Sequence, residues 1–294
     1  MYKLMQPLKV FKTLLILILL IGMSYVGFMT YEEAKQYEDY TSKLASVGDA
    51  NSLAHERIDE LTEIISLGLV KNESKNALEQ LRTKQSDAKT QSKQYLYYFI
   101  LLLSILIIFT FTCTIRVAAM SLSAATFVSL IYGLINPILM VTIQKEIEYL
   151  GNVILSFESK GIIGSIIKLY ESGELVVAFT ILLFSILLPV AKSFTLTFML
   201  IFHQSPWNKK LIAFFKHIGK WSMLDVFVVS TFLVYFTSDS GGISQAEIQV
   251  GLYFFLIYVI LSMVTAILTL KLLEKFQSNE TISPSLHPYD LKKL

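Results

Sequence analysis

A lysine and an aspartate lie inside two separate apolar segments that are each long enough to cross a membrane. Lys192 belongs to the apolar run 175–201, and Asp225 belongs to the run 222–238. A full charge at bilayer depth costs roughly 2.5–3.5 kcal/mol on insertion scales. Opposite charges on consecutive membrane helices offset this cost by pairing, so the two residues mark either a functional site or a structural ion pair. A lysine can also extend its ammonium group to the nearer membrane surface.

Other polar side chains accompany these two charges. Ser185, Pro189 and Lys192 follow one another at helical spacing and share nearly one face of their segment. Ser222 lies three residues before Asp225 and therefore shares its face. The last apolar segment contributes the hydroxyls of Ser262, Thr265 and Thr269. Hydroxyls in membrane helices often bond their own backbone, so the convergence of several with two charges is a stronger signal than any one of them.

A third apolar segment, 121–143, contains the pair Asn136 and Pro137. Proline inside a helix removes one hydrogen bond and frees a carbonyl, which neighbours or water must then satisfy. Asn136 either provides that partner or lines a cavity.

The composition is that of a membrane protein. Of 294 residues, 54% are hydrophobic and only 16% are charged, whereas charged residues make up about a quarter of a soluble domain. The net charge of +2 gives no indication of a nucleic-acid partner. One cysteine and four scattered histidines supply neither a disulfide framework nor metal-ligand spacing. There is no HExxH, GxSxG or paired-carboxylate motif, so we expect no metal, no cofactor and no enzymatic activity.

About twenty apolar residues cross a hydrocarbon core as a helix. Six runs qualify, at 10–30, 95–115, 121–143, 175–201, 222–238 and 249–271. A short turn around Arg116 separates the second run from the third. Basic residues gather in alternate loops, which places both termini in the cytoplasm. We read the first run as an uncleaved anchor, because no A-x-A cleavage site follows it. The predicted fold is an all-α integral membrane protein with six transmembrane helices.

The polar segment 31–94 predicts a helical hairpin outside the membrane, with its turn near residues 68–76. Small or apolar residues recur in a 3–4 alternation typical of a coiled-coil seam. They are Leu44, Val47, Asn51, Ala54, Ile58, Leu61 and Ile65, then Leu78, Leu81, Gln85, Ala88, Ser92 and Tyr95. Gly48 and Asn51 indicate a kink or break in the first arm. The hairpin is either purely structural or a docking surface for a partner.

Two further segments predict helices at the membrane surface. Within 144–174, Ile162, Ile163, Ile166, Ile167 and Tyr170 lie on one side of a short amphipathic helix that leads into the next span. On the cytoplasmic side, the lysine-rich segment 207–221 fits a helix in the membrane plane.

The stretch GKWSMLDVFVV, which contains Trp221, Ser222 and Asp225, closely resembles the signature of the paraquat-inducible protein A family. The preceding FSILLPVAK is similar to that family's Ser-x-x-x-Pro-x-x-Lys element, and NPILMVTI to its Leu-Pro-hydrophobic-Met segment, with Asn136 in place of the usual leucine. The resemblance covers residues 116–275, which form one four-helix module. Better-known members carry two such modules, each preceded by a Cys-rich zinc ribbon. This chain has one module and no ribbon, which leaves open whether it acts alone, as a homo-oligomer or with another subunit.

The resemblance implies a component of a phospholipid transport system in a bacterial inner membrane. Its implied partner is of the MCE type, a periplasmic lipid-binding assembly that the protein would load with lipids or receive lipids from. It also implies an intramembrane polar network that carries protons, formed by Lys192, Asp225, Ser185, Ser222 and Thr265. Asp225 would be the protonatable group and Lys192 its charge partner.

These observations predict five regions along the chain. They are an N-terminal cytoplasmic segment and anchor (1–30), a periplasmic hairpin (31–94), a second transmembrane helix (95–115), the four-helix module (116–275) and a cytoplasmic tail (276–294). The alternative function is a membrane sensor or scaffold that binds a partner through the hairpin.

Overall fold

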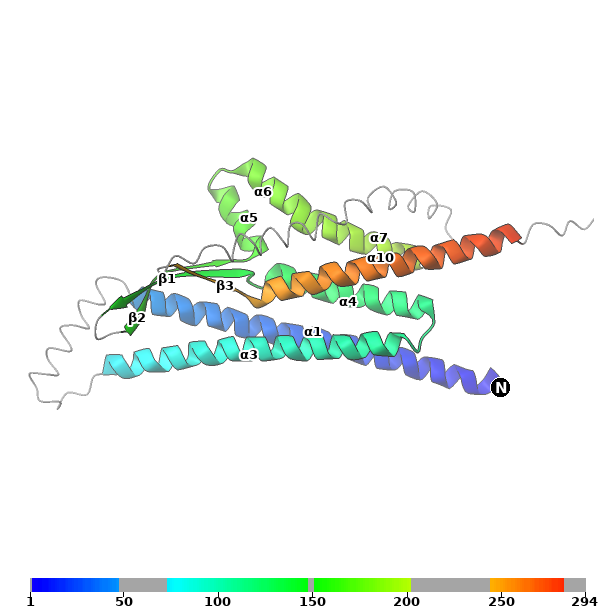
Figure 1. Ribbon diagram of the computed structural model, residues 1–294, viewed down its shortest axis with the longest axis horizontal. Coiled ribbons are helices and arrows are strands. Elements are labelled where there is room, and N and C mark those ends of the chain that lie inside the picture. Colours follow the sequence, from blue (N-terminus) through cyan, green and yellow to red (C-terminus); the bar gives the residue numbers. More distant parts are fainter. Residues whose placement is uncertain (1, 48–72, 148–150, 202–243, 283–294) are drawn as a thin grey trace, which may run out of the picture.

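The structure is a computed structural model that describes residues 2–47, 73–147, 151–201 and 244–282. Figure 1 shows long helices that lie side by side, with a small sheet at one end. The elements, in chain order, are α1 (Tyr2–Val47), α3 (Glu73–Thr110), α4 (Ile115–Ile135), β1 (Leu139–Ile147), β2 (Gly151–Lys160), α5 (Ile162–Glu171), α6 (Leu175–Ile181), the π-helical segment η1 (Leu182–Leu187), α7 (Leu188–Ile201), β3 (Ser244–Ile248) and α10 (Val250–Ile282).

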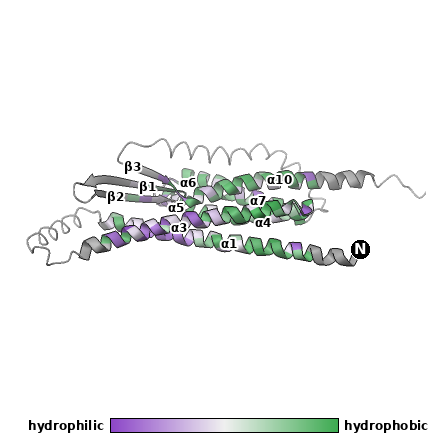
Figure 2. Ribbon diagram, turned by 60° about the horizontal axis from the view of Figure 1, so that its bottom comes forward, coloured by the Kyte–Doolittle hydropathy of each residue, from purple (hydrophilic) through white to green (hydrophobic). Residues whose placement is uncertain are grey.

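The described residues contain five helical runs that are long and apolar enough to cross a membrane. They are Val10–Ser46, Leu78–Thr110, Ile115–Ile135, Leu175–Ile201 and Val250–Leu272. Figure 2 shows apolar residues along these runs and hydrophilic residues at the ends of α1 and α3 near the sheet. The prediction of a helical membrane protein is confirmed, and the predicted span 222–238 lies outside the described residues. The last helix continues to Ile282, beyond the predicted limit at 271.

The predicted hairpin is built from α1 and α3, which pack along each other. Each is one continuous helix, so the expected boundaries between span and hairpin fall inside helices. The coiled-coil seam is present where the residues are described, because Leu44, Ala88 and Ser92 are buried. Gln85 Nε2 also donates to Thr41 Oγ1 over 2.8 Å. The seam positions 51–65, the predicted kink and most of the predicted turn lie outside the described residues.

The connection from α3 to α4 comes earlier in the chain than predicted. α3 ends at Thr110 and α4 begins at Ile115. Between them the backbone is tightly wound, since the Thr112 amide donates to the Phe109 carbonyl over 3.0 Å. Arg116 therefore lies in the first turn of α4 and not in a loop.

The predicted span 121–143 is wrong at its C-terminal end, because α4 stops at Ile135. Pro137 has no N–H to continue the helix, and its ring disfavours helical geometry for the residue before it. Asn136 accordingly takes an extended conformation, with φ −75° and ψ 150°. The proline thus ends the helix instead of interrupting it, and the chain continues into a strand.

A three-stranded antiparallel sheet has the order β2-β1-β3. β1 overlaps the end of the predicted span 121–143, while β2 and β3 lie in segments between the predicted spans. Leu139 at the start of β1 lies opposite Lys160 on one side and Ile248 on the other. The ladder with β3 ends at Ile143, while the ladder with β2 runs the whole length of β1. Since β1 follows α4 and β3 precedes α10, the sheet lies at the end where these two helices meet (Figure 1). The predicted amphipathic helix is confirmed as α5.

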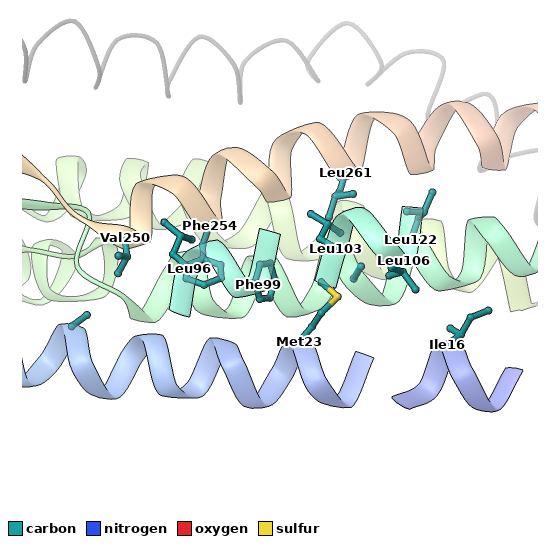
Figure 3. Packing of buried hydrophobic residues seen from close by; sticks show 12 residues of the cluster. Ile16, Met23, Leu96, Phe99, Leu103, Leu106, Leu122, Val250, Phe254 and Leu261 are labelled. Atoms are coloured by element: carbon teal, nitrogen blue, oxygen red, sulfur yellow. The ribbon is translucent and has the colours of Figure 1, made fainter. Parts of the chain in front are cut away.

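The main core joins the hairpin to the other helices. Met23 of α1, Phe99 and Leu106 of α3, and Phe254 of α10 are fully buried. Figure 3 shows these side chains between the helices. The rings of Phe99 and Phe254 meet edge to face at 4.8 Å between centroids, a favourable aromatic geometry. The hairpin is therefore an integral part of the bundle.

Candidate functional site

Hydroxyl side chains from three apolar helices meet where α4, α7 and α10 pack together. Ser123 Oγ lies 2.7 Å from Thr197 Oγ1, and Thr126 Oγ1 lies 3.4 Å from Thr265 Oγ1. Thr126 donates its proton to the Leu122 carbonyl over 2.7 Å. Because a hydroxyl carries one proton, Thr126 then accepts from Thr265. The hydroxyl row, as we call it, comprises Ser123, Thr126, Ser193, Thr197, Ser262 and Thr265.

Two members of the hydroxyl row are buried without a hydrogen-bond partner among the described residues. Ser193 is 2% exposed, Ser262 is 0% exposed, and the Oγ atom of each is unpaired in this part of the chain. A buried unpaired hydroxyl costs about 1–3 kcal/mol, and few occur in native proteins. Each oxygen can still donate one hydrogen bond and accept two. The row thus retains capacity to bind a polar group or a proton carrier.

The helix that carries Ser185 and Pro189 changes its winding just before the proline. Residues Leu182–Leu187 form a π-helical segment, and the Leu188 amide donates to the Leu183 carbonyl. Pro189 has no N–H with which to bond the Ser185 carbonyl, which accounts for the altered winding. Single π turns of this kind often occur at functional sites. The Pro189 carbonyl accepts a hydrogen bond from the Tyr258 hydroxyl at 3.2 Å and so ties this point to α10.

The predicted site residues divide into two groups. Ser185 and Pro189 are buried and Lys192 is half-buried on η1 and α7, one residue before Ser193 of the hydroxyl row. Thr265 lies on α10, which packs against α7. The predicted residues outside the described part of the chain are Trp221, Ser222 and Asp225. The pairing of Lys192 with Asp225 therefore stays a prediction.

The Asn136–Pro137 pair lies away from the hydroxyl row, at the junction of α4 with the sheet. Asn136 is fully buried, and its Nδ2 donates to the Tyr132 carbonyl over 2.7 Å. The Gly251 amide donates to the Pro137 carbonyl over 2.9 Å. A Cβ atom at Gly251 would come within 2.5 Å of that carbonyl oxygen, so the close approach requires glycine. At 1.5 Å per residue, Gly251 stands about 21 Å along α10 from Thr265.

A charged cluster that the sequence analysis missed attaches the hairpin to the sheet. The carboxylate of Glu247 in β3 lies 2.8 Å from Lys89 Nζ and 3.5 Å from Lys93 Nζ. It also accepts a hydrogen bond of 3.0 Å from the Tyr37 hydroxyl of α1. The two lysines are four residues apart beside the coiled-coil seam, and this spacing was the available signal for a shared acidic partner.

The chemistry of these groups is that of hydrogen bonding and charge. The hydroxyl row lies between helices of membrane-spanning length, where polar groups are costly and are commonly functional. No group of three or more His, Cys, Asp or Glu side chains that could hold a metal ion occurs among the described residues. What the row can do is bind a polar group at its unpaired hydroxyls or share a proton within the pairs Ser123–Thr197 and Thr126–Thr265.

Comparison with known proteins gives two matches. The family model described as paraquat-inducible protein A matches residues 116–272. A curated protein of Haemophilus influenzae, "Probable intermembrane transport protein", is 29% identical over 100 residues, which cover 32% of this chain and 24% of that protein. The match thus spans about a quarter of that relative's length. No solved structure matches the chain.

The limits of the family match coincide with elements of the structure. It begins at the first turn of α4 and ends within α10, so it contains the hydroxyl row and the sheet and leaves out the hairpin helices α1 and α3. Several long apolar helices together with this match indicate a multi-pass membrane protein. Because the matched residues make up more than half of the sequence, the chain belongs to the paraquat-inducible protein A family.

Proposed function

We propose that the protein is an inner-membrane component of a phospholipid transport system, which loads lipids into a periplasmic partner of the MCE type or receives them from it. The family membership and the name of the Haemophilus influenzae relative support a transport role. The observation that carries the proposal is the hydroxyl row, in which Ser193 and Ser262 are buried and unpaired among the described residues. Apolar packing alone gives no reason to keep such costly groups between membrane helices.

The transport is coupled to protons through an intramembrane network in this proposal. Asp225 is the protonatable group and Lys192 its charge partner, with Ser185, Ser222 and Thr265 completing the network. Lys192 is half-buried on α7, the helix that also carries Ser193 and Thr197 of the hydroxyl row, and this placement is compatible with the assignment. Hydroxyls that both donate and accept can pass a proton along a chain of hydrogen bonds.

The membrane orientation follows from the distribution of basic residues. Both termini lie in the cytoplasm, and the hairpin and the sheet lie in the periplasm, where the MCE partner is found. The end of α4, the start of α10 and the sheet all lie at one end of the bundle, which is consistent with this arrangement (Figure 1). The protein acts alone, as a homo-oligomer or with another subunit, and the hairpin is the docking surface for the MCE partner.

The test of the network is lipid transfer in cells that also express an MCE partner. Photo-activated phospholipids should cross-link to the partner when the wild-type protein is present. We expect Lys192→Ala and Asp225→Asn each to reduce this transfer by at least about tenfold, the effect of losing roughly 1.4 kcal/mol of the required interaction. If both variants accumulate normally in the membrane and still transfer lipid at the wild-type rate, the proton network is wrong.

Matched controls come from an exposed ion pair outside the module. Lys43 Nζ and Asp39 lie 2.6 Å apart on the surface of α1. Lys43→Ala and Asp39→Asn make the same chemical changes as the two network variants, and we expect both to keep wild-type transfer. Because this pair lies on the hairpin proposed as the docking surface, co-purification with the MCE partner is measured beside transfer. Loss of transfer with the partner still bound would show that general charge removal, and not the network, is responsible.

The alternative is a scaffold or sensor role, in which the hairpin binds a partner. The observation that favours it is the contact of Glu247 with Lys89 and Tyr37, which joins the hairpin helices to the sheet. The discriminating variant replaces residues 48–72 by a short Gly-Ser linker and leaves Lys89, Lys93, Tyr37 and Glu247 in place. For a docking hairpin we expect lost co-purification with the MCE partner. If the linker variant still binds the partner and transfers lipid, residues 48–72 are not part of the docking surface. If the variant loses binding and the wild-type protein itself transfers no lipid, the scaffold role is favoured.

A further inference from the structure

Helix α5 carries an apolar stripe that faces away from the rest of the protein. Ile163, Ile167 and Tyr170 recur at intervals of four and three residues and therefore share one face. They are 42%, 53% and 67% exposed. A stripe of large apolar side chains left open to water is unfavourable, which indicates that something apolar covers it.

The two flanks of the stripe on α5 are already in contact with the protein, which determines how the stripe is presented. Ile162 packs against a buried cluster that includes Leu130 of α4 and Leu252 of α10. Lys168 forms an ion pair with Glu158 of β2. The helix is therefore held against the end of the bundle and against the sheet, and its open face cannot turn inward.

The chain runs directly from α5 into a membrane-length helix. A turn at Gly173, with φ +83°, joins Glu171 to the start of α6 at Leu175. Val176 at this start is 81% exposed, and the run Leu175–Ile201 is one of those apolar enough to cross a membrane. Figure 1 shows α5 and α6 meeting at a sharp angle beside the sheet. The helix that carries the stripe thus leads directly into a helix apolar and long enough to span a membrane.

We propose that α5 binds the lipid surface on the sheet's side of the membrane, with Ile163, Ile167 and Tyr170 placed between the headgroups and the upper acyl chains. An amphipathic helix lies in this region with its apolar face inward. Tyr170 suits this position, because its ring is apolar and its hydroxyl is polar, as in the aromatic belts of membrane proteins. The inference rests on the multi-pass membrane fold and does not depend on the proposed transport.

Site-directed labelling of the full-length protein tests this directly. In a Cys113→Ser background, a fluorophore is attached to Ile167→Cys, and the protein is reconstituted into vesicles of phosphatidylethanolamine and phosphatidylglycerol. The matched control is Lys168→Cys, the next residue on the same helix, whose side chain is 70% exposed. Val176→Cys is the lipid-facing reference, and Lys84→Cys on the hairpin is the aqueous reference.

We expect the label at residue 167 to be quenched strongly by doxyl lipids and weakly by iodide, as at residue 176. The label at residue 168 should show the opposite preference, as at residue 84. Ile163→Cys gives a second position in case the first variant does not fold. Equal iodide quenching at 167 and 168 without lipid quenching would overturn the proposal, and energy transfer between labelled copies would assign the stripe to a homo-oligomer instead. Lipid quenching in a transport-deficient variant would support the membrane contact even if the proposed transport failed.

Discussion

The hydroxyl of Tyr37 donates to the carboxylate of Glu247 over 3.0 Å, although the two residues are 210 positions apart in the sequence. Tyr37 belongs to the N-terminal hairpin, which lies outside the family match at 116–272, and Glu247 lies inside it. The side chain of Glu247 therefore joins the region that matches the family model to the N-terminal hairpin, which lies outside that match.

Replacing Glu247 should loosen this attachment. We expect Glu247→Ala to lower stability modestly, because each partly exposed ion pair is worth about 0.2–1 kcal/mol, and to leave the Tyr37 hydroxyl without its acceptor. Thermal unfolding of the detergent-solubilised protein, with a double-mutant cycle against Lys89→Ala, measures the coupling. Lys43→Ala, in the exposed pair with Asp39, should change the midpoint less. A cycle with no coupling would mean that the contacts at Glu247 contribute nothing to holding the hairpin.

The close approach at Gly251 predicts a strong effect of one added methyl group. Its Cβ would lie 2.5 Å from the Pro137 carbonyl oxygen and 2.6 Å from that of Asn136, and these backbone atoms cannot move easily. We expect Gly251→Ala to cost about 1–3 kcal/mol or more, as overpacking does. The same change at Gly164 in α5 meets open space and should stabilise by about 0.5–1 kcal/mol. Equal midpoints for the two variants in thermal unfolding would contradict this packing.

Asn136 offers a test of how a buried amide is tolerated. Its Nδ2 bonds the Tyr132 carbonyl, but its Oδ1 has no partner among the described residues. We expect Asn136→Leu to change stability by less than about 1 kcal/mol, because the lost hydrogen bond is offset by removal of the unpaired oxygen. Asn136→Asp should be much more damaging, since it buries a charge. Thermal unfolding should give a higher midpoint for Asn136→Leu than for Asn136→Asp. An aspartate variant as stable as the leucine variant would contradict this prediction.

The hydroxyl row predicts a separation of stability from transport. Thr126→Val and Thr265→Val keep the side-chain shape and remove one interhelical contact of 3.4 Å. We expect Thr265→Val to change stability by no more than about 1 kcal/mol, because Thr126 keeps its bond to the Leu122 carbonyl. Thr126→Val should cost about 1–3 kcal/mol, because it leaves the buried Thr265 hydroxyl without that partner. If the row takes part in transport, lipid transfer should fall several-fold in each variant. Thr269→Val is the control, because this hydroxyl bonds only the Thr265 carbonyl one turn away among the described residues. Wild-type transfer in both row variants would restrict the row to a structural role.

The membrane helices could be predicted from the sequence because an apolar run of twenty residues leaves few alternatives. The end of α4 can also be predicted, since Pro137 disfavours a helical Asn136, but the apolar residues that follow Pro137 favour a continuous span. The strands are a different case. β3 has five residues, and it exists because β1 pairs with it from Leu139 to Ile143. Such pairing depends on tertiary structure and leaves little local pattern.

The candidate site was predicted only in part. Ser262, Thr265 and Thr269 were recognised as interior hydroxyls of the last span. Their counterparts Ser123, Thr126 and Thr197 were not, because the rotation of each apolar helix about its axis cannot be read from a segment that is hydrophobic on all sides. Glu247 was missed for a related reason, since its partners come from a distant segment.

The short connection between α3 and α4 keeps the hairpin close to the rest of the protein. Only the residues between Thr110 and Ile115 separate the two helices, so the hairpin meets the family module as part of the same chain. Such tethering presents one binding surface to another at an effective concentration on the order of millimolar. Contacts as weak as those of Glu247 would not hold two separate chains together at cellular concentrations. Within one chain they add to the apolar core that already packs the hairpin helices against α4 and α10.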